Sequence, residues 1–367
     1  MVEVLTLADS APGAPLIPGS LRAALSGGNR IVRFRVSGYI RLTHNLVVRG
    51  PNVTIDGRDA PNRGIALWNY SLFLLGNNLI VRHIRFRGSH PTETHEGLLI
   101  GGSADVLIDH VSCSWATDEC IGMFGDSNTG PVRRVTIQHS LIAEAPENRP
   151  GTSGMLVAGD VSEVTWYRNV FAKNINRNPQ ITTGCRKRAG GCVALSGVGR
   201  YELIQNVVYD MIYGTRLWNQ SSNWSIELDA IGNLWLAGPR RPNPKIPIMI
   251  FNYPRSLGPI RVFLKGNFGP PRASRTGQPC DDFSLESANA PCAGWAPQHN
   301  AAQRQISQYL LPVGGAAGNL DGILAEVGAR RPCRDYADAR VIDELHTGRS
   351  SRVVLPKGFP NLTLPCP

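Results

Sequence analysis

Short runs of alternating apolar and polar residues recur along the first two thirds of the chain. They are rich in β-branched residues, which is typical of strands, and most of them end in a turn on Asn, Gly or Asp. From Val53 onward, successive runs begin 26 to 37 residues apart. The runs begin at Ile31, Val53, Leu79, Val106, Val135, Val164, Tyr201, Leu228 and Val262.

This spacing argues against two other repetitive folds. Units of strand and helix need helical patterns of about 10–15 residues between the strands, and no such pattern fills the gaps here. Propeller blades of about 40–45 residues would contain four strands per repeat. We therefore predict an all-β chain folded as a parallel β-helix, in which each coil buries its inward Val, Ile and Leu side chains against the coils on either side.

Four asparagines occur at one equivalent place in the repeats, five residues after the start of a run. Asn tolerates left-handed turn geometry, and its amide can hydrogen-bond along a stack of coils. The alternative interpretation is that they are ordinary turn residues. They are Asn169, Asn206, Asn233 and Asn267.

The two ends of the chain depart from the repeat. Residues 18–25 predict a short capping helix that begins after Ser20 and closes the apolar end of the coils. Beyond Gly269 the pattern fades into a tail with two short amphipathic helices, at 320–329 and 338–346. We expect a β-helix domain over residues 1–300, followed by a C-terminal extension over 301–367 that packs on it.

Composition limits the choice of partners. No run of about 18 apolar residues occurs, so we expect no membrane span. The net charge of +10 favours a polyanionic partner. Nucleic acid is the obvious rival, but the basic residues are scattered, with clusters only at 186–188 and 240–241, and no zinc-finger, basic-helix or aromatic RNA-binding pattern accompanies them.

The cysteines form an even set without a CxxC pair, which makes zinc and thioredoxin-like chemistry weak interpretations. Disulfides in an oxidising compartment fit better, and buried free thiols are the alternative. We expect a secreted protein whose export signal has been removed, and a monomer. The cysteines are Cys113, Cys120, Cys185, Cys192, Cys280, Cys292, Cys333 and Cys366.

Candidate chemistry gathers between residues 94 and 180. Glu96, Asp118 and Glu119 stand beside two strand-like runs, and Arg177 is followed directly by Asn-Pro. Carboxylate oxygens are ligands that Ca²⁺ prefers. A fixed arginine beside a hard cation suits chemistry on an acidic sugar polymer.

Several motifs, in a shared order, make the chain resemble the pectate lyase family, especially bacterial secreted members of the first polysaccharide lyase family. The motifs are PGSLRAAL, NVTIDGRDAP, IVRHIRFR, IDH…SW..DE, NRNP and DARVIDELHTG. The resemblance covers most of the chain. It implies a right-handed parallel β-helix that cleaves α-1,4-linked polygalacturonate by calcium-assisted β-elimination and releases unsaturated oligogalacturonides.

By this resemblance, Glu96, Asp118 and Glu119 stand where the family holds calcium. Their alternative interpretation is solvated turn acids. Thr94 takes a position where some members have a further ligating Asp, so we expect calcium to bind weakly or together with substrate. Asp109 and His110 match a structural rather than a catalytic pair.

Arg177 matches the base of the family. Its guanidinium is nearly always protonated, which makes it an awkward base and favours action at high pH. Many members carry a second arginine shortly after the Pro, but residues 180–182 of this chain are Gln, Ile and Thr. Arg186 and Lys187 come later and are candidates to replace it.

Lys173 and Arg149 are further candidates for binding uronate carboxylates, with ordinary surface charges as the alternative. Two other functions compete with a pectate lyase: a pectin-binding β-helix without activity, or a lyase for another polyuronate. A hydrolase needs paired carboxylates, and the pair at 281–282 lies in the tail. Four tryptophans could stack on sugars or pack in the core: Trp166, Trp218, Trp224 and Trp235.

Overall fold

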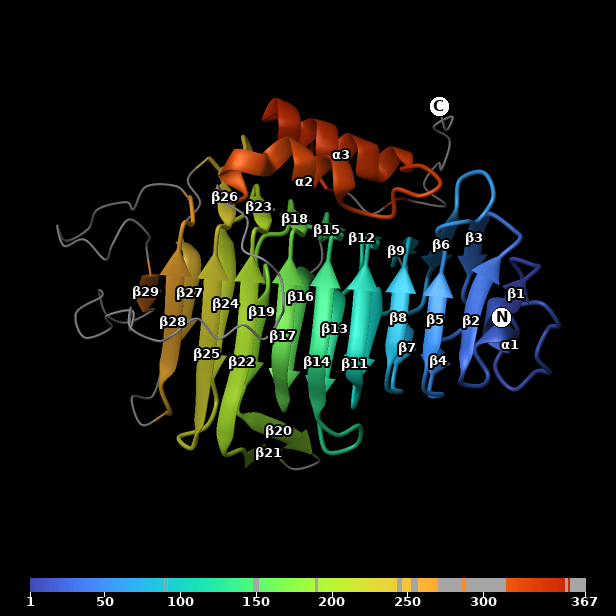
Figure 1. Cartoon of the computed structure of the whole chain (residues 1–367), viewed down its shortest axis with the longest axis horizontal. Helices are drawn as coiled ribbons and strands as arrows, with labels where there is room; N and C mark the ends of the chain where they lie inside the picture. The colour runs from blue at the N-terminus through green and yellow to red at the C-terminus, as the bar shows by residue number, and fades with distance from the viewer. Residues whose placement is uncertain are drawn as a thin grey trace.

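Nearly all strands of the chain lie in three parallel sheets that wind around one core. The computed structural model describes residues 1–88, 90, 92–147, 152–188, 191–242, 246–251, 257–269, 285–287, 315–353 and 356. Each coil contributes one strand to each sheet, and the sheets lie side by side along the molecule (Figure 1). Among the described helices, none is long and apolar enough to cross a membrane. The predicted parallel β-helix is confirmed.

The strands follow the order of the coils. The ten-stranded sheet contains β1 (Val2–Val4), β2 (Arg30–Phe34), β5 (Val53–Asp56), β8 (Leu79–Arg82), β11 (Ala104–Asp109), β14 (Val132–Gln138), β17 (Val161–Tyr167), β22 (Gly197–Ile204), β25 (Trp224–Ile231) and β28 (Ile260–Lys265). The nine-stranded sheet contains β4 (Leu46–Val48), β7 (Leu72–Leu74), β10 (Leu98–Gly101), β13 (Glu119–Gly125), β16 (Ser153–Gly159), β19 (Gln180–Thr183), β24 (Tyr213–Asn219), β27 (Ile246–Phe251) and β29 (Leu285–Ser287). The eight-stranded sheet contains β3 (Gly38–Arg41), β6 (Ile65–Trp68), β9 (Ile84–Arg87), β12 (Ser112–Ser114), β15 (Leu141–Ala143), β18 (Val170–Ala172), β23 (Val207–Tyr209) and β26 (Leu234–Leu236).

The predicted repeat is present in the register of the ten-stranded sheet. The residues that begin the runs from Val53 to Val262 pair with one another from strand to strand, and all are buried. Ile31 is the exception: Arg30 is the partner of Val53, and Ile31 is exposed. The apolar side chains of the ladder therefore stack on one another inside the coils.

The asparagines form the predicted ladder. The side-chain oxygens of Asn206, Asn233 and Asn267 each accept hydrogen bonds from the residue one coil before, at 2.9–3.0 Å from both its backbone and its amide nitrogen. Because these groups are largely buried, the ladder satisfies polar groups that would otherwise be costly inside the protein.

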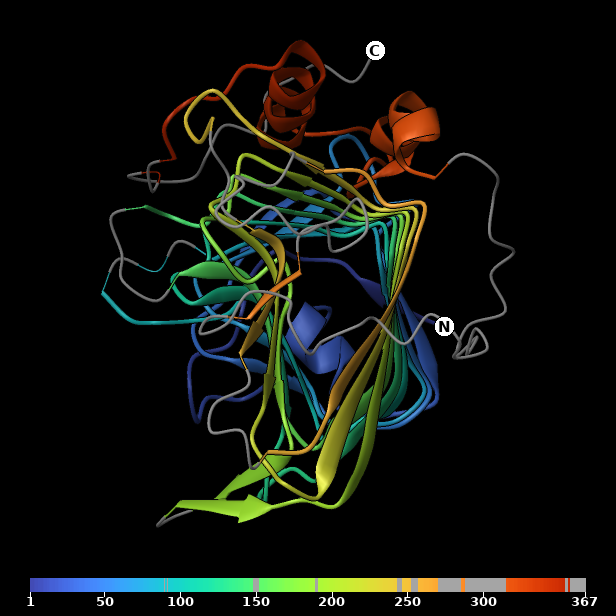
Figure 2. The same ribbon diagram turned by 90° about the vertical axis from the view of Figure 1, so that its left-hand side faces the viewer.

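The helix α1 (Leu21–Ala24) closes the first coil, as predicted. Its N-cap Ser20 accepts a hydrogen bond from the Ala23 N–H, and Leu21 and Ala24 join the core. Figure 2 looks along the coils and shows α1 between the sheets at the far end. The hairpin of β20 (Cys185–Arg188) and β21 (Gly191–Ala194) projects from one corner of the same view.

Two C-terminal helices, α2 (Leu320–Glu326) and α3 (Tyr336–Thr347), follow a short 3-10 turn, η1 (Ala317–Asn319), and cover the outer face of the eight-stranded sheet (Figure 1). Both predicted tail helices are thus present. They bury Ile323, Leu324, Val341 and Leu345 against apolar residues of β15, β18, β23 and β26. The predicted domain boundary at 300/301 lies outside the described residues.

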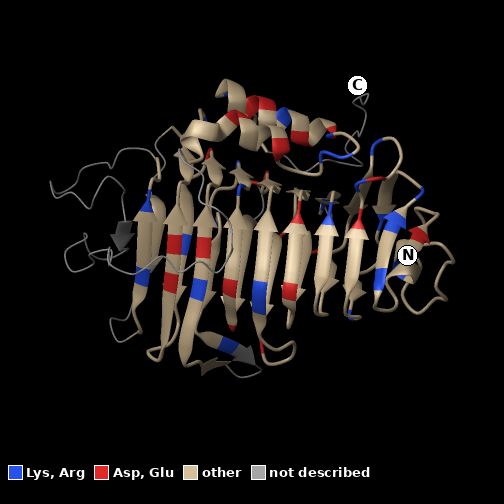
Figure 3. Ribbon diagram, in the orientation of Figure 1, with Lys and Arg blue, Asp and Glu red and all other residues tan. Residues whose placement is uncertain are grey.

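Charge is mixed on the outer face of the ten-stranded sheet. Figure 3 shows basic and acidic bands interspersed across it. Neighbouring coils pair these charges, as Arg134 does with Asp105 at 2.7 Å and Arg82 with Asp56 at 2.7 Å. This face therefore does not form the coherent basic stripe that a nucleic-acid site would need.

Candidate active site

Three carboxylates converge at the edge of two adjacent strands of the nine-stranded sheet. Glu96 lies just before β10, while Asp118 and Glu119 lie at the start of β13. One oxygen of each lies within 4.8 Å of the others. The Thr117 and Asp118 N–H groups both donate to the His95 carbonyl at 3.1 Å, which holds the two loops together. The predicted acids are thus brought into one cluster.

A disulfide fixes the loop that carries two of these acids. Cys113 on β12 is bonded to Cys120, the residue after Glu119 on β13. A covalent clip over so short a loop reduces the number of conformations that Asp118 and Glu119 can adopt. The Cys185–Cys192 bridge closes the β20–β21 hairpin in the same way.

The electrostatics of the acidic cluster favour a cation. Burial raises the pKa of Glu96, and the neighbouring charge of Asp118 raises it further. Burial also raises the pKa of Asp118, although Arg177 opposes that shift. Carboxylates gathered in a poorly hydrated place repel one another, and a bound cation would relieve both effects. The donor set consists of carboxylate oxygens, which are ligands that Ca²⁺ prefers.

Arg177 lies in a tight turn that enters β19. Its backbone is left-handed, with φ of 58°, and the Asn178–Pro179 peptide bond that follows is cis. The Met155 N–H on β16 donates to the Arg177 carbonyl at 2.7 Å. Gly154, next to Met155, is required by this close approach, because a Cβ there would lie 2.8 Å from the same carbonyl oxygen. The turn therefore holds the arginine at a fixed place on the sheet.

The Arg177 side chain reaches the acidic cluster. Its guanidinium donates a hydrogen bond to Glu119, and 26% of the side chain is exposed to solvent. Burial lowers the pKa of this guanidinium, while the charge of Asp118 raises it. The structure thus brings Arg177 to the acidic cluster, and its role as a base stays a prediction from the family resemblance.

Several known proteins have sequences similar to this chain. A curated protein of Aspergillus fumigatus, named probable pectate lyase C, is 33% identical to this chain over 331 residues, which cover 90% of the chain and 70% of that protein. This chain belongs to the pectate lyase family. No profile of a protein family matches it.

Other pectate lyase relatives match a shorter region. Probable pectate lyase C of Aspergillus flavus is 34% identical over 223 residues, 60% of this chain and 47% of that protein. The chain thus spans about half the length of the curated relatives that it matches in this way. The motifs resemble bacterial members most, whereas these relatives are fungal. The crystal structure of the major allergen from cedar pollen has the same fold, with a TM-score of 0.58 at 14% identity over 89% of this chain and 88% of that one.

Lys173 contacts α3 and its neighbours, and its hydrogen-bond partners among the described residues do not include the acidic cluster. The sequence predicts it as a substrate contact, but its side chain is only 1% exposed beneath α3. Its ammonium donates to Glu144 at 2.8 Å, Glu344 at 2.7 Å and Ser351 at 3.0 Å. A substrate carboxylate would have to break this buried network, so the structure assigns Lys173 to docking α3.

Of the other predicted contacts, Arg186 has a side chain in the described part of the structure. Arg186 forms an ion pair with Asp160, which also binds Arg133. Arg186 therefore has a structural partner already. Lys187 belongs to β20, but its side chain lies outside the described part of the structure, as does all of Arg149.

Arg216 lies next to the Arg177 turn and was not singled out from the sequence. It lies on β24, paired with Gln180 on the strand that Arg177 leads into. Nothing in the letters around it marks a motif. The coil repeat could have identified it. One coil after Gln180, the chain returns to the same face of the sheet, and Arg216 occupies that position.

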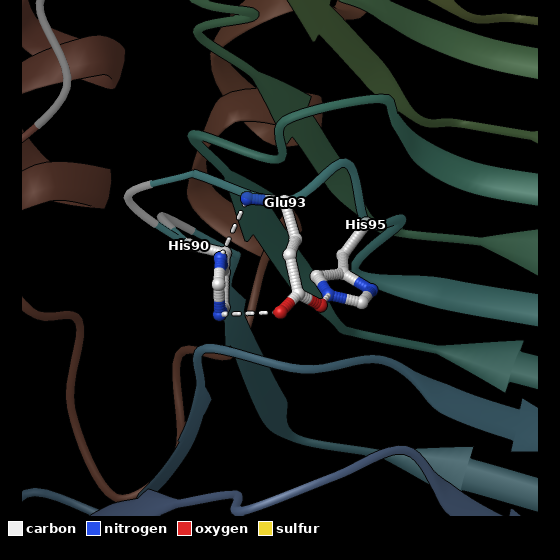
Figure 4. Close-up of side chains that lie close together, drawn as sticks. All are labelled: His90, Glu93 and His95. Atoms are coloured by element: carbon white, nitrogen blue, oxygen red, sulfur yellow. Dashed lines mark hydrogen bonds and ion pairs between the residues drawn. The ribbon is translucent and has the colours of Figure 1, made fainter.

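A second group of possible metal ligands lies in the loop before Glu96. His90, Glu93 and His95 bring one ligand atom each within 4.8 Å (Figure 4). However, the Nδ1 atom of His90 accepts a hydrogen bond from the Glu93 N–H at 2.8 Å. A neutral His90 then carries its proton on Nε2, which faces the Glu93 carboxylate. The Nε2 atom of His95 lies 2.9 Å from the same carboxylate. Hydrogen bonding accounts for this group without a metal.

Proposed function

We propose that this protein is a pectate lyase that cleaves α-1,4-linked polygalacturonate by β-elimination. The observation that carries the proposal is the contact between Arg177 and the cluster of Glu96, Asp118 and Glu119. A hydrolase of this fold would need a pair of carboxylates acting as acid and base. Here the acids adjoin an arginine, which suits removal of a proton from a uronate.

Glu96, Asp118 and Glu119 would hold Ca²⁺ in this proposal. The ion would neutralise the carboxylate of the bound uronate and so make the adjacent C5 proton more acidic. Glu96 lies over Gly122, where a Cβ would be 3.4 Å from its Cγ atom. Glu96 thus faces the outer side of the sheet, where a polymer can reach it.

Arg177 would take the C5 proton in its neutral form. Burial favours that form, because a charged guanidinium is poorly solvated at this place. The electron pair of the C5–H bond forms the C4–C5 double bond, and the bond from C4 to the glycosidic oxygen breaks. The departing oxygen takes a proton from water. The products are one fragment with an unsaturated uronate at its non-reducing end and a second fragment with a new reducing end.

The proposal includes export to an oxidising compartment. Cys113–Cys120 and Cys185–Cys192 are bridged, and Cys333 is also disulfide-bonded. Such disulfides are rare in a reducing cytosol. Labelling of free thiols in the denatured, unreduced protein tests this: abundant reactive thiols would contradict export.

The test of activity is the ultraviolet absorbance of unsaturated uronides from a panel of polyuronates, with calcium and with excess chelator. We expect product from polygalacturonate that is lost on chelation and recovered with calcium. Saturated ends would indicate a hydrolase. Polymer binding without any product would indicate a non-catalytic pectin-binding protein, and product from another polyuronate alone would change the substrate.

A further inference from the structure

Arg216 and Arg177 occupy neighbouring coils on the outer face of the nine-stranded sheet. Leu217 and Ile181 are partners in register and fully buried, so the residues beside them point outward. Arg216 therefore shares the outer face with Gln180, one coil beyond the turn that carries Arg177. Neighbouring strands are about 4.8 Å apart.

The backbone of β24 is bonded directly to the Arg177 turn. The Arg216 N–H donates to the Pro179 carbonyl at 3.0 Å, and the Asn178 N–H donates to the Gly214 carbonyl at 3.1 Å. The Thr215 hydroxyl adds a bond to the Asn178 carbonyl at 3.0 Å. These bonds hold the two arginines in a fixed relation, so a ligand that reaches one would find the other at a constant offset.

The two guanidinium groups repel each other. Burial lowers the pKa of Arg216, and the positive charge of Arg177 lowers it further. The Arg216 guanidinium lies over the Tyr213 ring, 5.9 Å from its centre. The two guanidinium groups therefore lie close enough on one face of the sheet to interact electrostatically.

A buried amide oxygen points to a ligand at the same place. Gln180 is only 7% exposed; its Nε2 donates to the Thr182 hydroxyl at 2.8 Å, while its Oε1 has no hydrogen-bond partner. Buried polar atoms without a partner are uncommon in folded proteins. A sugar hydroxyl could donate to this oxygen. Trp218, the partner of Thr182 in register, is 40% exposed on the same face and offers a ring on which a sugar could stack.

We propose that Arg216 and Gln180 form a uronate subsite next to the one that Arg177 serves, with Arg216 binding the carboxylate and Gln180 Oε1 accepting a hydroxyl. This inference rests on the proposed function. The segment after Pro179 lacks the second arginine of many family members. In this inference, Arg216 on the next coil supplies that positive charge instead. Since Arg216 would bind the neighbouring uronate equally in the ground state and the transition state, it is a specificity residue and not part of the proton transfer.

The test compares Arg216→Gln with Arg216→Lys and with Arg261→Gln, an exposed arginine on β28 of another sheet. Kinetics on polygalacturonate should show KM raised about 10- to 100-fold by Arg216→Gln with kcat nearly unchanged, as expected for a lost charge-assisted bond. Arg216→Lys should lose less. Arg261→Gln should behave like the parent. On methyl-esterified pectin, which lacks the carboxylate, the effect of Arg216→Gln should largely disappear.

Binding without catalysis separates this inference from the proposed function. Calorimetry with trigalacturonate is performed on Arg177→Ala, alone and combined with Arg216→Gln. The double variant should bind about 10-fold or more weakly. Adding Thr182→Arg to Arg216→Gln places an arginine one coil back on the same face and should restore much of the affinity. Equal binding by the single and double variants would overturn the subsite even if the protein is an active lyase. A difference in binding would uphold it even if no product forms.

Discussion

The guanidinium of Arg177 reaches across the β16 position of the sheet to the carboxylate of Glu119 on β13. One residue proposed as the base thus contacts one residue proposed as a metal ligand. A cation bound at Glu119 and the charged form of Arg177 would repel each other. Protonation of Arg177 and calcium binding at the acidic cluster should therefore oppose each other.

This linkage predicts that two substitutions of Arg177 have different effects, one on activity and one on calcium binding. Arg177→Lys keeps a charge but not the planar guanidinium, and we expect kcat to fall by roughly 100-fold or more with the fold intact, as for the loss of a general base. Arg177→Ala should also bind calcium about twofold to tenfold more tightly, because the competing cation is gone. Steady-state kinetics measure the change in kcat, and calcium titration measures the change in calcium affinity. Retention of most kcat in Arg177→Lys would place the base elsewhere.

Charge removal in the acidic cluster should affect the calcium requirement. Glu96→Gln or Glu119→Gln should raise the calcium concentration for half-maximal activity by about 10-fold or more, because each removes an oxygen anion from the ligand set. The matched control is Glu163→Gln, an acid on the ten-stranded sheet with no place in the cluster. If the three variants have the same calcium dependence, the metal assignment is incorrect.

The disulfide next to Glu119 should support the same site. Replacing both Cys113 and Cys120 by Ala removes the clip on the loop that carries Asp118 and Glu119. We expect a lower melting temperature and weaker calcium binding, since the freed loop must be ordered on binding. The control is the paired Ala substitution at Cys185 and Cys192, which should leave calcium affinity unchanged. If calcium affinity is unchanged in both double variants, the Cys113–Cys120 disulfide does not support the calcium site.

Lys173 should matter for stability. Lys173→Met leaves Arg340 as the cation that Glu144 and Glu344 still share. Because breaking a buried charge network typically costs about 3–5 kcal/mol of unfolding free energy, we expect a loss at the lower end of that range. Chemical denaturation measures the loss, with Lys265→Met on β28 as a surface control. A stable variant with a raised KM would instead support Lys173 as a substrate contact.

A stack of histidines predicts acid sensitivity. The rings of His83, His110 and His139 stack at 4.9 Å from coil to coil. Burial, followed by the charge of His110, lowers the pKa of His83 and of His139 to about 4. In the unfolded chain a histidine titrates near 6.5. Between these values the unfolded state binds more protons, so the stabilisation present above pH 6.5 is lost as the pH falls toward 4.

Thermal melts across that range test the stack. The melting temperature should fall from pH 6.5 to pH 4, and the fall should be shallower in the double variant His83→Gln/His139→Gln. The slope is the readout, because the variant can be less stable at every pH. An identical slope in both proteins would mean that other groups control the acid sensitivity.

The repeating features of the coils could be predicted from the sequence. The positions of side chains near the turns that connect one sheet to the next could not. The coil starts and the Asn ladder are visible because similar runs recur once per coil. Asp118 and Glu119 are visible because they are adjacent in sequence, and Glu96 was found through the family resemblance. Lys173 and Arg177 are four residues apart, yet the chain turns between them from the eight-stranded to the nine-stranded sheet, so one lies under α3 and the other faces the acids. Arg216 pairs with Gln180 across a coil whose length is set by the β20–β21 hairpin, and a variable insertion of this kind hides the register.

Coil stacking also restricts how such an enzyme can change. Hairpins and loops at the corners, such as β20–β21, can lengthen or shorten without moving the strands that they connect. The distance between the strands of Glu119 and Arg177, by contrast, can change only in whole steps of about 4.8 Å. Deleting or duplicating one complete rung between β13 and β19 would shift the proposed base by one step relative to the proposed cation site, while each rung could still fold. Insertions in this lineage should therefore accumulate in loops, with the rung count between the two residues held constant.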